Sequence, residues 1–551
     1  MKRYLLAALD SPGWLVLLVP LAAVLGLTLF GDGAARPPDQ GDEPTYALQA
    51  SSLAWDFDLK YAEEDYQRYF EQWGARPKGI DLDSPDGGHT QVFARPFYHA
   101  LLTVPFVRVM PYRGIRVANA LLLAAASILA AWALGRHFGS AAPVWVAVFV
   151  FASVAFSHVF LATADVFLLA VTAIGFALVY AGQPEPPLSS MYQGPRSWSA
   201  GTLGRWLAIG ALLAIPGTYR LPYVLLLVPA AVALQKSLQS LRAIAWTGLI
   251  LGAGLVFALT SFVQTLAGGE PFWSLSGLRP TLDAGLLLWS GIYFLIGRSV
   301  GLLPYFLPAL LAFAAFRSDR GRWALLAAAG LGALAFLVLR PYDFAGVGGG
   351  VGNRLFLPLY AALWFLPGRP LRASWAVVTA ALAAPILFPI WTHPAAPEPS
   401  RLALWLPYEA TQKDLPGDWI SYGGIRVKPT SPNVWRAERG SDLRIAGDET
   451  GGLVAASVEP LEGLVLDFDR NAPSRLIANG QELKPTVLRP DGSVSFEIPL
   501  GSARTHPMGW SGGDAHVYQV SFRLPEAPAK PIGFRIHASR DVVIQRSGEG
   551  R

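Results

Sequence analysis

Two adjacent carboxylates, Asp42 and Glu43, lie shortly after the first long apolar run of the chain. Pro44 and a helix-like apolar stripe follow them. This order is typical of a helix N-terminus, at which Asp42 accepts backbone N–H bonds and Pro44 occupies the first turn. Paired carboxylates at an aqueous boundary can also deprotonate a hydroxyl or hold a divalent cation, although one pair alone rarely completes a metal site. Both interpretations are kept, since one carboxylate can cap the helix while the other reacts.

Two further charged residues interrupt apolar sequence. Asp165 separates two apolar runs. Placing an ionisable group within a membrane segment costs free energy, so such a residue usually has a function. We expect Asp165 either to bind a substrate or cation, or to cap the helix that it begins. Arg220 is the corresponding cation and lies in a break between Pro216 and Pro222.

The composition indicates an integral membrane protein. Of 551 residues, 52% are hydrophobic and only 15% charged, against about 25% charged in ordinary globular domains. The net charge of +5 is too small and too scattered for a nucleic-acid-binding protein. The absence of cysteine excludes disulfides, thiolate metal sites and cysteine nucleophiles.

Apolar runs near the length of about 20 residues needed to cross a bilayer recur along the chain. The runs free of Asp, Glu, Lys and Arg are 14–30, 117–134, 141–164, 166–182, 243–269, 299–316, 323–339 and 373–392. Residues 206–235, broken by Arg220, and the short run 355–367 bring the prediction to about eleven crossings. The first run is expected to remain as a helix, because no Ala-x-Ala-like cleavage site follows it.

The distribution of basic residues predicts the orientation, because cytoplasmic loops retain Lys and Arg. With the N-terminus inside, the inside loops hold Lys2, Arg3, Arg136, Arg196, Arg205, Lys236, Arg242, Arg317, Arg320, Arg322, Arg369 and Arg372. Segments 31–96, 268–297, 340–354 and the chain after about residue 392 then lie outside. One span instead of two within 205–235 would reverse everything downstream.

Several arginines then lie on the side where few are expected: Arg95, Arg108, Arg113, Arg116, Arg220, Arg279, Arg298, Arg340 and Arg354. A phosphorylated substrate or anionic lipid head group would account for them, and so would simple snorkelling at helix ends. His89, Arg95 and His99 in the same region either line the path of a substrate or are merely solvated.

The last part of the chain predicts a separate all-β domain. Short alternating segments at 463–469, 494–499, 517–523 and 532–537 are separated by turns such as Asn479-Gly480 and Asp491-Gly492. We expect a linker at 393–416 and an extracytoplasmic β-sandwich at 417–551. Its Trp419, Trp435 and Trp510 either bind glycan or fill the core.

Common catalytic motifs are missing or misplaced. The sequence has no Walker A, His-Glu-x-x-His or Rossmann fingerprint. Two matches to Gly-x-Ser-x-Gly, at 297–301 and 509–513, fall at a membrane boundary and in the β-rich region. That motif has meaning only between a strand and a helix of an α/β sheet, so both are attributed to chance.

Three segments carry a resemblance to a known family: Gly41-Asp-Glu-Pro-Thr-Tyr46, Gly297-Arg-Ser-Val-Gly-Leu-Leu-Pro-Tyr-Phe306 and Gly352-Asn-Arg-Leu-Phe-Leu-Pro-Leu-Tyr360. With the acidic pair after the first span and the C-terminal β domain, the chain resembles the GT-C glycosyltransferases. The nearest branch contains the protein O-mannosyltransferases and lipid A aminoarabinose transferases. The resemblance covers residues 1–392, including a first outer loop at 31–96. The Trp-Trp-Asp-Tyr-Gly signature of oligosaccharyltransferases is absent.

The resemblance implies a hexosyl- or pentosyltransferase of the bacterial inner (plasma) membrane, with its active site and β domain facing the periplasm. Its partners would be membrane lipids, a polyprenyl-phosphate sugar donor, and a hydroxyl acceptor on a cell-envelope glycan, lipid or protein. It implies Asp42 as the base, or the group that positions the acceptor, with Glu43 as its neighbour.

Negative charge develops on the departing phosphate, so the reaction also needs cations. Arg298 and Arg354 are the predicted phosphate clamps, each in a glycine-containing outer segment. The donor-phosphate set adds Asn353 and Arg220, and the glycine-rich run 346–352 is either an anion-binding nest or a flexible loop. The predicted substrate-binding residues are Asp165, Tyr46, His89, Arg95 and His99.

Two other functions stay open. In a transporter or lipid flippase, Asp165, Arg220 and the proline breaks would form a mid-membrane pathway. In a non-catalytic envelope protein, the β-sandwich would bind glycan and the helices would only anchor it. The long polar segment 31–96 and the lack of an evident internal repeat favour the transferase over the transporter, and about eleven spans are excessive for an anchor.

Overall fold

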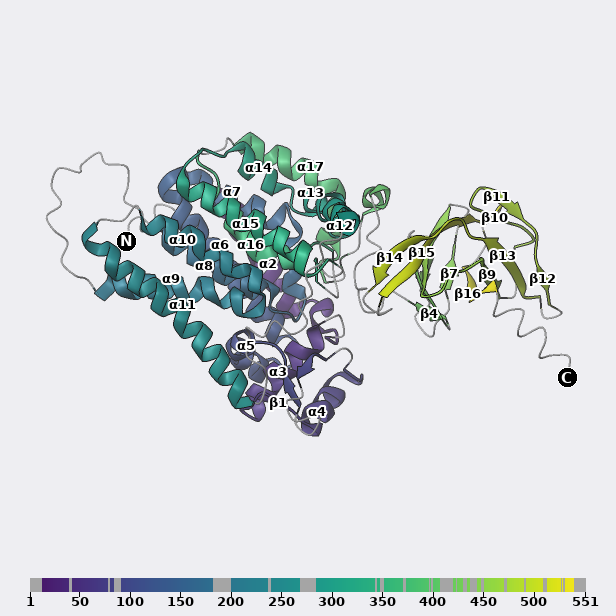
Figure 1. The fold of residues 1–551 in the computed structure, drawn as a ribbon, viewed down its shortest axis with the longest axis horizontal. Coiled ribbons are helices and arrows are strands. Elements are labelled where there is room, and N and C mark those ends of the chain that lie inside the picture. The colour runs from purple at the N-terminus through teal and green to yellow at the C-terminus, as the bar shows by residue number, and fades with distance from the viewer. Residues whose placement is uncertain are drawn as a thin grey trace. The chain divides into compact units, whose positions relative to one another are not determined.

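The computed structural model divides the chain into two compact units, Met1–Pro407 and Tyr408–Arg551, each described by itself (Figure 1). It describes residues 12–539 except 39–41, 78–79, 84–90, 182–199, 236–238, 268–283, 342–343, 347–350, 370–372, 396, 398–399, 407–419, 423, 430–433, 437–442, 447–449, 470–472, 490–491, 509–512, 527 and 529–530.

The first unit is built mainly from helices. Its α-helices are α2 (Pro12–Phe30), α3 (Glu43–Trp55), α4 (Glu63–Trp73), α5 (Tyr98–Val109), α6 (Gly114–Phe138), α7 (Ala142–Phe151), α8 (Asp165–Ala181), α9 (Ala200–Tyr219), α10 (Leu227–Leu234), α11 (Gln239–Ala267), α12 (Ala284–Ile296), α13 (Leu302–Tyr305), α14 (Pro308–Ala314), α15 (Arg320–Leu339), α16 (Leu357–Leu363) and α17 (Ala373–Thr392). Short 3-10 helices add η1 (Asp32–Ala35), η2 (Gly139–Ala141), η3 (Val154–Phe160), η4 (Leu221–Leu226), η5 (Arg354–Phe356) and η6 (Arg401–Trp405). Between α2 and α6, strands β1 (Lys60–Tyr61), β2 (Leu82–Asp83) and β3 (Gln91–Phe93) form a small antiparallel sheet.

The predicted multi-pass membrane class is confirmed. Within the described residues, the helices long and apolar enough to cross a membrane are Pro12–Phe30, Gly114–Phe151, Arg242–Ala267, Arg320–Leu339 and Ser374–Thr392. Shorter apolar helices cover Asp165–Ala181, Leu221–Leu234, Leu287–Ile296 and Arg354–Leu363. The total of about eleven crossings stays a prediction.

The predicted span 141–164 is wrong in its second half. The α-helix α7 ends at Phe151, and η3 is followed by irregular backbone at 161–164. An apolar run identifies a buried segment, but it cannot show that side chains elsewhere in the fold will satisfy non-helical backbone. Those side chains belong to the site described below.

Two other regions depart from a simple pattern of spans. The run 206–235 breaks into two pieces at Arg220, as its prolines predicted. The apolar helix α12 lies in segment 268–297, which was expected to lie on the outer face. In the following run, predicted as the span 299–316, only the short helices α13 and α14 form.

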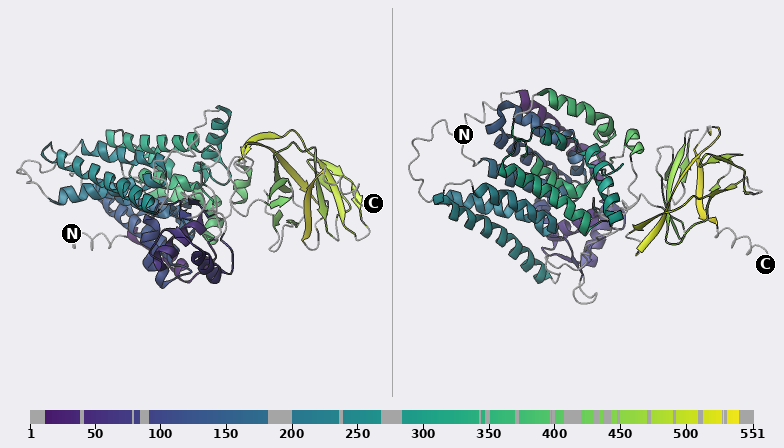
Figure 2. Two further views of the ribbon diagram at one scale, coloured as in Figure 1. Left: turned by 60° about the horizontal axis from the view of Figure 1, so that its bottom comes forward. Right: turned by 45° about the horizontal axis from the view of Figure 1, so that its top comes forward.

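Helices α9 and α11 run side by side (Figure 2), and glycines let their backbones approach. A Cβ on Gly252 would lie 2.1 Å from the Leu207 carbonyl oxygen, and one on Gly210 would lie 2.2 Å from that of Leu249. Gly248 and Gly252 form a Gly-x-x-x-Gly pair, the usual small-residue interface between membrane helices.

Helices α8 and α16 lie inside the bundle. Every residue of α16 is buried, and most of α8 is buried as well. The 3-10 turn η5, which carries Arg354, leads directly into α16 and is also buried. The interior therefore holds the two segments that begin at Arg354 and at Asp165.

The second unit confirms the predicted all-β domain. One sheet has the order β11-β10-β15-β8-β5-β4 with β14 paired to β15, and the other has the order β12-β13-β9-β16-β7-β6. The strands are β4 (Ile420–Tyr422), β5 (Ile425–Pro429), β6 (Val434–Arg436), β7 (Leu443–Ile445), β8 (Gly451–Ser457), β9 (Gly463–Phe468), β10 (Leu476–Ala478), β11 (Gln481–Leu483), β12 (Val487–Leu488), β13 (Val494–Pro499), β14 (Arg504–Met508), β15 (Gly513–Arg523) and β16 (Ile532–Ala538). Residues from both sheets share one hydrophobic core, as expected of a sandwich.

The predicted turn at Asn479-Gly480 joins β10 to β11 with positive φ at both residues, 50° and 81°. This is the backbone twist that a two-residue hairpin needs. Trp419 and Trp510, which were considered for glycan binding, lie outside the described residues, and Trp435 is described only as part of β6.

Candidate active site

Asp42 lies immediately before α3, yet its side chain does not cap the helix. Its Oδ2 atom instead accepts hydrogen bonds from Arg95 Nη2 at 3.1 Å and from Arg354 Nη2 at 3.0 Å. These arginines are 53 and 312 residues away in the sequence. Pro44 occupies the first turn as predicted. The predicted side-chain cap by Asp42 does not form, and its carboxylate binds the two arginines instead.

The two arginines also contact further carboxylates. Arg95 Nη2 lies 2.6 Å from Asp81 Oδ2, and Arg354 Nη1 lies 3.8 Å from Asp165 Oδ2. The result is an alternating series, Asp81–Arg95–Asp42–Arg354–Asp165, which we call the ion-pair chain. The Asp42 side chain at its centre is 15% exposed, so it is largely but not completely buried.

The charges around Asp42 determine its protonation. Burial by itself raises the pKa of the Asp42 carboxyl, but the Arg95 and Arg354 guanidiniums outweigh it and hold that pKa well below its usual value. Arg220 acts in the same direction. Asp42 is therefore ionised at neutral pH, and it is a weak base for as long as both arginines remain bound to it.

Two uncharged side chains line the same region. Burial raises the pKa of Tyr46 to about 12 and lowers the pKa of His99 to about 4. Their rings meet edge to face with centroids 5.5 Å apart, and the Nε2 atom of His99 lies 3.1 Å from Asn119 Oδ1. Both groups are neutral at neutral pH, so they can form hydrogen bonds without adding charge.

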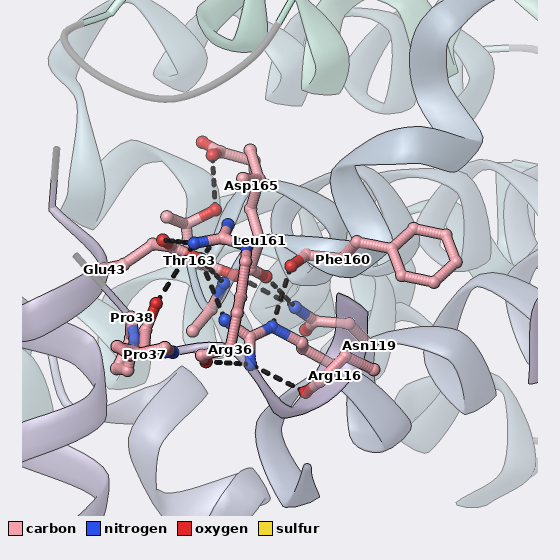
Figure 3. Close-up of polar contacts among 12 residues, drawn as sticks. Arg36, Pro37, Pro38, Glu43, Arg116, Asn119, Phe160, Leu161, Thr163 and Asp165 are labelled. Atoms are coloured by element: carbon pink, nitrogen blue, oxygen red, sulfur yellow. Dashed lines mark hydrogen bonds and ion pairs between the residues drawn. The ribbon is translucent and has the colours of Figure 1, made fainter. Parts of the chain in front are cut away.

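Glu43 has a different environment from Asp42. Its side chain is fully buried and accepts hydrogen bonds from both terminal nitrogens of Arg36, at 3.0 and 3.1 Å. It also contacts Arg116 Nη2 at 3.5 Å and accepts a 2.7 Å hydrogen bond from the Ala162 amide (Figure 3). Two guanidiniums and one backbone amide thus surround a carboxylate that has no exposed surface.

The irregular backbone at 161–164 is held by side chains from α6. Arg116 Nε donates to the Phe160 carbonyl at 2.8 Å, and Asn119 Nδ2 donates to the carbonyls of Leu161 and Thr163 at 3.1 and 3.2 Å (Figure 3). Backbone polar groups inside a membrane bundle must find protein partners, and these side chains supply them.

The same arrangement fixes Asp165 at the start of α8. Thr163 Oγ1 donates a 2.6 Å hydrogen bond to Asp165 Oδ2, the oxygen that faces Arg354. The predicted alternatives for Asp165 were a functional group and a helix cap. In the described structure its carboxylate contacts the Arg354 guanidinium and the Thr163 hydroxyl.

Glycines shape the segment that carries Arg354. A Cβ on Gly346, whose φ is +84°, would lie 2.5 Å from Arg354 Nε. One on Gly352, whose φ is +98°, would lie 2.4 Å from Val154 Cγ1. Both positions therefore require glycine, for the left-handed backbone and for close packing. Residues 347–350 of the glycine-rich run, predicted to be either an anion-binding nest or a flexible loop, lie outside the described part of the chain.

Three hydrogen bonds stabilise this segment, two to other elements and one within the segment itself. The Gly352 amide donates to the Ser299 carbonyl at 2.6 Å, and the Tyr223 hydroxyl donates to the Leu355 carbonyl at 2.7 Å. Asn353 Oδ1 accepts from the Phe356 amide at 3.0 Å. Asn353, a predicted phosphate ligand, thus caps η5 and orients Arg354.

The remaining predicted residues fall into different classes. Arg298 joins the region through its backbone, where its carbonyl accepts from the Tyr305 hydroxyl next to the Ser299 contact. Arg220 Nη1 donates to the Tyr219 carbonyl at 3.0 Å, and the guanidinium forms no ion pair with any described residue. His89 lies outside the described residues.

Three of the arginines that were expected on the outer side bind carbonyl oxygens. Arg108 Nε donates to Ala54 at 2.7 Å and Arg113 Nη1 to Leu29 at 2.6 Å, each near the end of a helix. Arg116 similarly holds the Phe160 carbonyl. Hydrogen bonds to backbone carbonyls are thus a reason for these three arginines that needs no phosphate. Arg95 and Arg354 differ, because their guanidiniums face carboxylates. Arg279 lies outside the described residues.

Several residues of the site were missed by sequence reasoning. Asp81, Arg36, Asn119 and Thr163 each contact a predicted site residue or the backbone next to one. The spacing of residues in the sequence does not identify them, because their partners lie in other elements of the fold. Among the described residues there is no group of three or more Asp, Glu or His side chains that could hold a metal ion.

Comparison with solved structures finds similarity to ArnT from Cupriavidus metallidurans, in a crystal structure bound to undecaprenyl phosphate and in one of the apo state. The chain is 20% identical to the first over 68% of its length, with a TM-score of 0.43. It is 19% identical to the second over 69% of its length, with a TM-score of 0.42. It spans 65% of either ArnT chain, slightly under two thirds. No protein-family model and no curated protein matches the sequence.

Proposed function

We propose that this protein is a GT-C type glycosyltransferase that moves a sugar from a polyprenyl-phosphate-linked donor to a hydroxyl acceptor. The reaction would take place at the outer face of a bacterial inner membrane. The observation that carries the proposal is the convergence of the Asp42 carboxylate with the guanidiniums of Arg95 and Arg354 in one partly exposed site. These are the groups that such a transfer requires.

The chemistry assigns a part to each charge. Asp42 accepts the proton of the acceptor hydroxyl as its oxygen attacks the anomeric carbon. The bond from that carbon to the phosphate oxygen breaks, and its electron pair leaves with the polyprenyl phosphate. Arg354 stabilises the negative charge that develops there, because guanidinium groups bind phosphate oxygens through directed hydrogen bonds.

The neighbouring groups support this arrangement. Asp165 lies against Nη1 of Arg354 while Asp42 binds Nη2, and the two carboxylates together orient the guanidinium. Tyr46, which is 5% exposed, offers a neutral hydrogen-bonding group suited to a sugar hydroxyl, and the fully buried His99 packs against its ring. A transporter would use Asp165 and Arg220 as a separate pathway, but Asp165 pairs with Arg354 and the charge of Arg220 acts on Asp42. One common site is therefore the simpler interpretation.

Replacement of Arg354 by alanine tests the donor site. We expect Arg354→Ala to raise the KM for a polyprenyl-phosphate-linked sugar by roughly one to two orders of magnitude, because a buried charge contact to the phosphate is lost. Initial rates of sugar transfer in proteoliposomes, measured against donor concentration, provide the readout. Arg108→Ala is the matched control, since Arg108 binds a backbone carbonyl. An unchanged response to donor concentration in Arg354→Ala would remove Arg354 from the phosphate site.

The packing of Gly346 gives an independent test of the same arginine. Gly346→Ala places a methyl group against the Arg354 side chain and strains the backbone at positive φ. We expect a rise of about tenfold in donor KM, since small displacements of a positioning group are costly. Gly330→Ala is the control, because a Cβ there meets nothing within 4 Å. Equal kinetics in both variants would show that Arg354 tolerates displacement.

A further inference from the structure

The Asp42 carboxylate is bound in the way that a phosphate oxygen would be bound. A single oxygen, Oδ2, accepts hydrogen bonds from Arg95 at 3.1 Å and Arg354 at 3.0 Å. Two guanidiniums converging on one anionic oxygen form a site for an oxyanion in general, and carboxylate and phosphate use the same geometry.

The two arginines do not depend on Asp42 for their position. Arg95 keeps its 2.6 Å contact with Asp81, and Arg354 keeps Asp165 at 3.8 Å and the packing of Gly346. If the Asp42 side chain turned away, each guanidinium would still contact another carboxylate, Arg95 through the same Nη2 atom and Arg354 through Nη1. A preformed anion site would remain between them.

We propose that Asp42 occupies the donor phosphate site of the unliganded protein, and that the donor phosphate displaces it from Arg95 and Arg354. This inference rests on the proposed function and deepens it in two ways. It assigns Arg95 to the donor phosphate, whereas the sequence analysis placed it among the substrate-binding residues and outside the donor-phosphate set. It also gives Asp42 two alternating states, bound to the arginines and turned toward the acceptor.

The charges of the site fit such an exchange. The phosphodiester of a polyprenyl-phosphate-linked sugar carries one negative charge, as the carboxylate does, so the two arginines lose one anion and gain one. Arg220 is already close enough to act on the charge of Asp42. Its Nε atom is buried without a hydrogen-bond partner among the described residues. It is therefore a third cation that can stabilise the added charge.

The exchange would couple donor binding to the activation of the base. A carboxylate held by two guanidiniums accepts a proton poorly, and one released from them accepts it more readily. The acceptor hydroxyl would then be activated only once a donor is in place. Donor binding and base activation become a single event at the same two arginines.

The exchange makes a prediction opposite to that for an ordinary ligand-binding residue. Asp42→Asn removes the competing anion, so it should bind undecaprenyl phosphate more tightly than the wild type, by roughly three- to tenfold. Undecaprenol lacks the phosphate, and its binding should not change. Binding of both probes to the full-length protein in nanodiscs provides the measurement. Asp42→Ser is a second neutral variant that should behave as Asp42→Asn does.

Asp56→Asn is the charge-matched control. It removes the same charge from the same part of the chain, but Asp56 pairs with Arg68, so affinity for undecaprenyl phosphate should stay at the wild-type value. Equal or weaker binding by both Asp42 variants, with wild-type binding intact, would overturn the exchange and leave the proposed function standing. Tighter binding by Asp56→Asn to the same extent would also overturn it, in favour of a general charge effect. A wild type that does not distinguish undecaprenyl phosphate from undecaprenol would overturn the proposed function as well.

Discussion

Replacement of Asp42 by asparagine is expected to lower the rate of sugar transfer by roughly two to four orders of magnitude while leaving the fold intact. Proton transfer by a positioned side chain contributes roughly 10²- to 10⁴-fold to catalysis. The asparagine amide has nearly the same shape and keeps an oxygen that can accept from Arg95 and Arg354. It cannot take the proton of the acceptor hydroxyl. The measurement is the initial rate with a saturating lipid-linked sugar, together with thermal unfolding of the purified protein.

Two comparisons make this result specific to Asp42. Asp56→Asn makes the same chemical change at an exposed pair with Arg68 and should keep wild-type turnover. Because Asp42→Asn is also expected to bind polyprenyl phosphate tightly, its loss of turnover should persist at high donor concentration. Turnover by Asp42→Asn at the wild-type rate would exclude Asp42 as the base, whatever its affinity for the donor.

The acidic pair shows how far the sequence could lead. The position of Asp42 and Glu43 after the first span, followed by Pro44, correctly indicated a helix N-terminus, although Asp42 does not cap it through its side chain. The sequence assigned both carboxylates to one site, whereas the structure directs Asp42 to Arg354 and Glu43 to Arg36. Adjacent side chains at a helix start point in different directions, and a partner 312 residues away leaves no trace in local spacing.

The membrane spans also show which features the sequence predicts from local composition and which depend on contacts made by the fold. Hydropathy depends on local composition, so it found the long helices and the break at Arg220. It could not find the irregular backbone at 161–164, because that backbone is satisfied by Asn119 and Glu43 from other elements. Irregular backbone inside a bundle is visible in sequence only through its partners, and those partners are identified by the fold.

The arginines were recognised as a class but not individually. The charge rule singled out basic residues on the unexpected side, and a phosphate or snorkelling could explain each of them equally well. What separates them is the atom that each guanidinium faces. Arg113 faces a carbonyl oxygen and stabilises a helix end, whereas Arg95 faces two carboxylates. An arginine that faces two carboxylates can bind another anion when one of those carboxylates moves away, and an arginine bound to a backbone carbonyl cannot.

Replacement of Glu43 should affect the fold before it affects the chemistry. Glu43→Gln leaves the guanidiniums of Arg36 and Arg116 without their common carboxylate in a buried position. Breaking a buried ion pair by removing one partner costs about 3–5 kcal/mol. We expect a large fall in the thermal unfolding temperature, since the loss also weakens the support of the 161–164 backbone. Thermal unfolding in detergent, beside Asp42→Asn, is the measurement.

The pair of variants separates positioning from catalysis. Asp42→Asn should lose turnover and keep its unfolding temperature, whereas Glu43→Gln should lose stability and retain the turnover of whatever fraction stays folded at low temperature. That retained turnover follows from the geometry, because Glu43 contacts Arg36, Arg116 and the Ala162 amide and has no exposed surface for a substrate. A Glu43→Gln protein that is fully stable yet inactive would reverse the assignment. Glu43 would then act in the reaction beside Asp42, as their adjacency in the sequence first indicated.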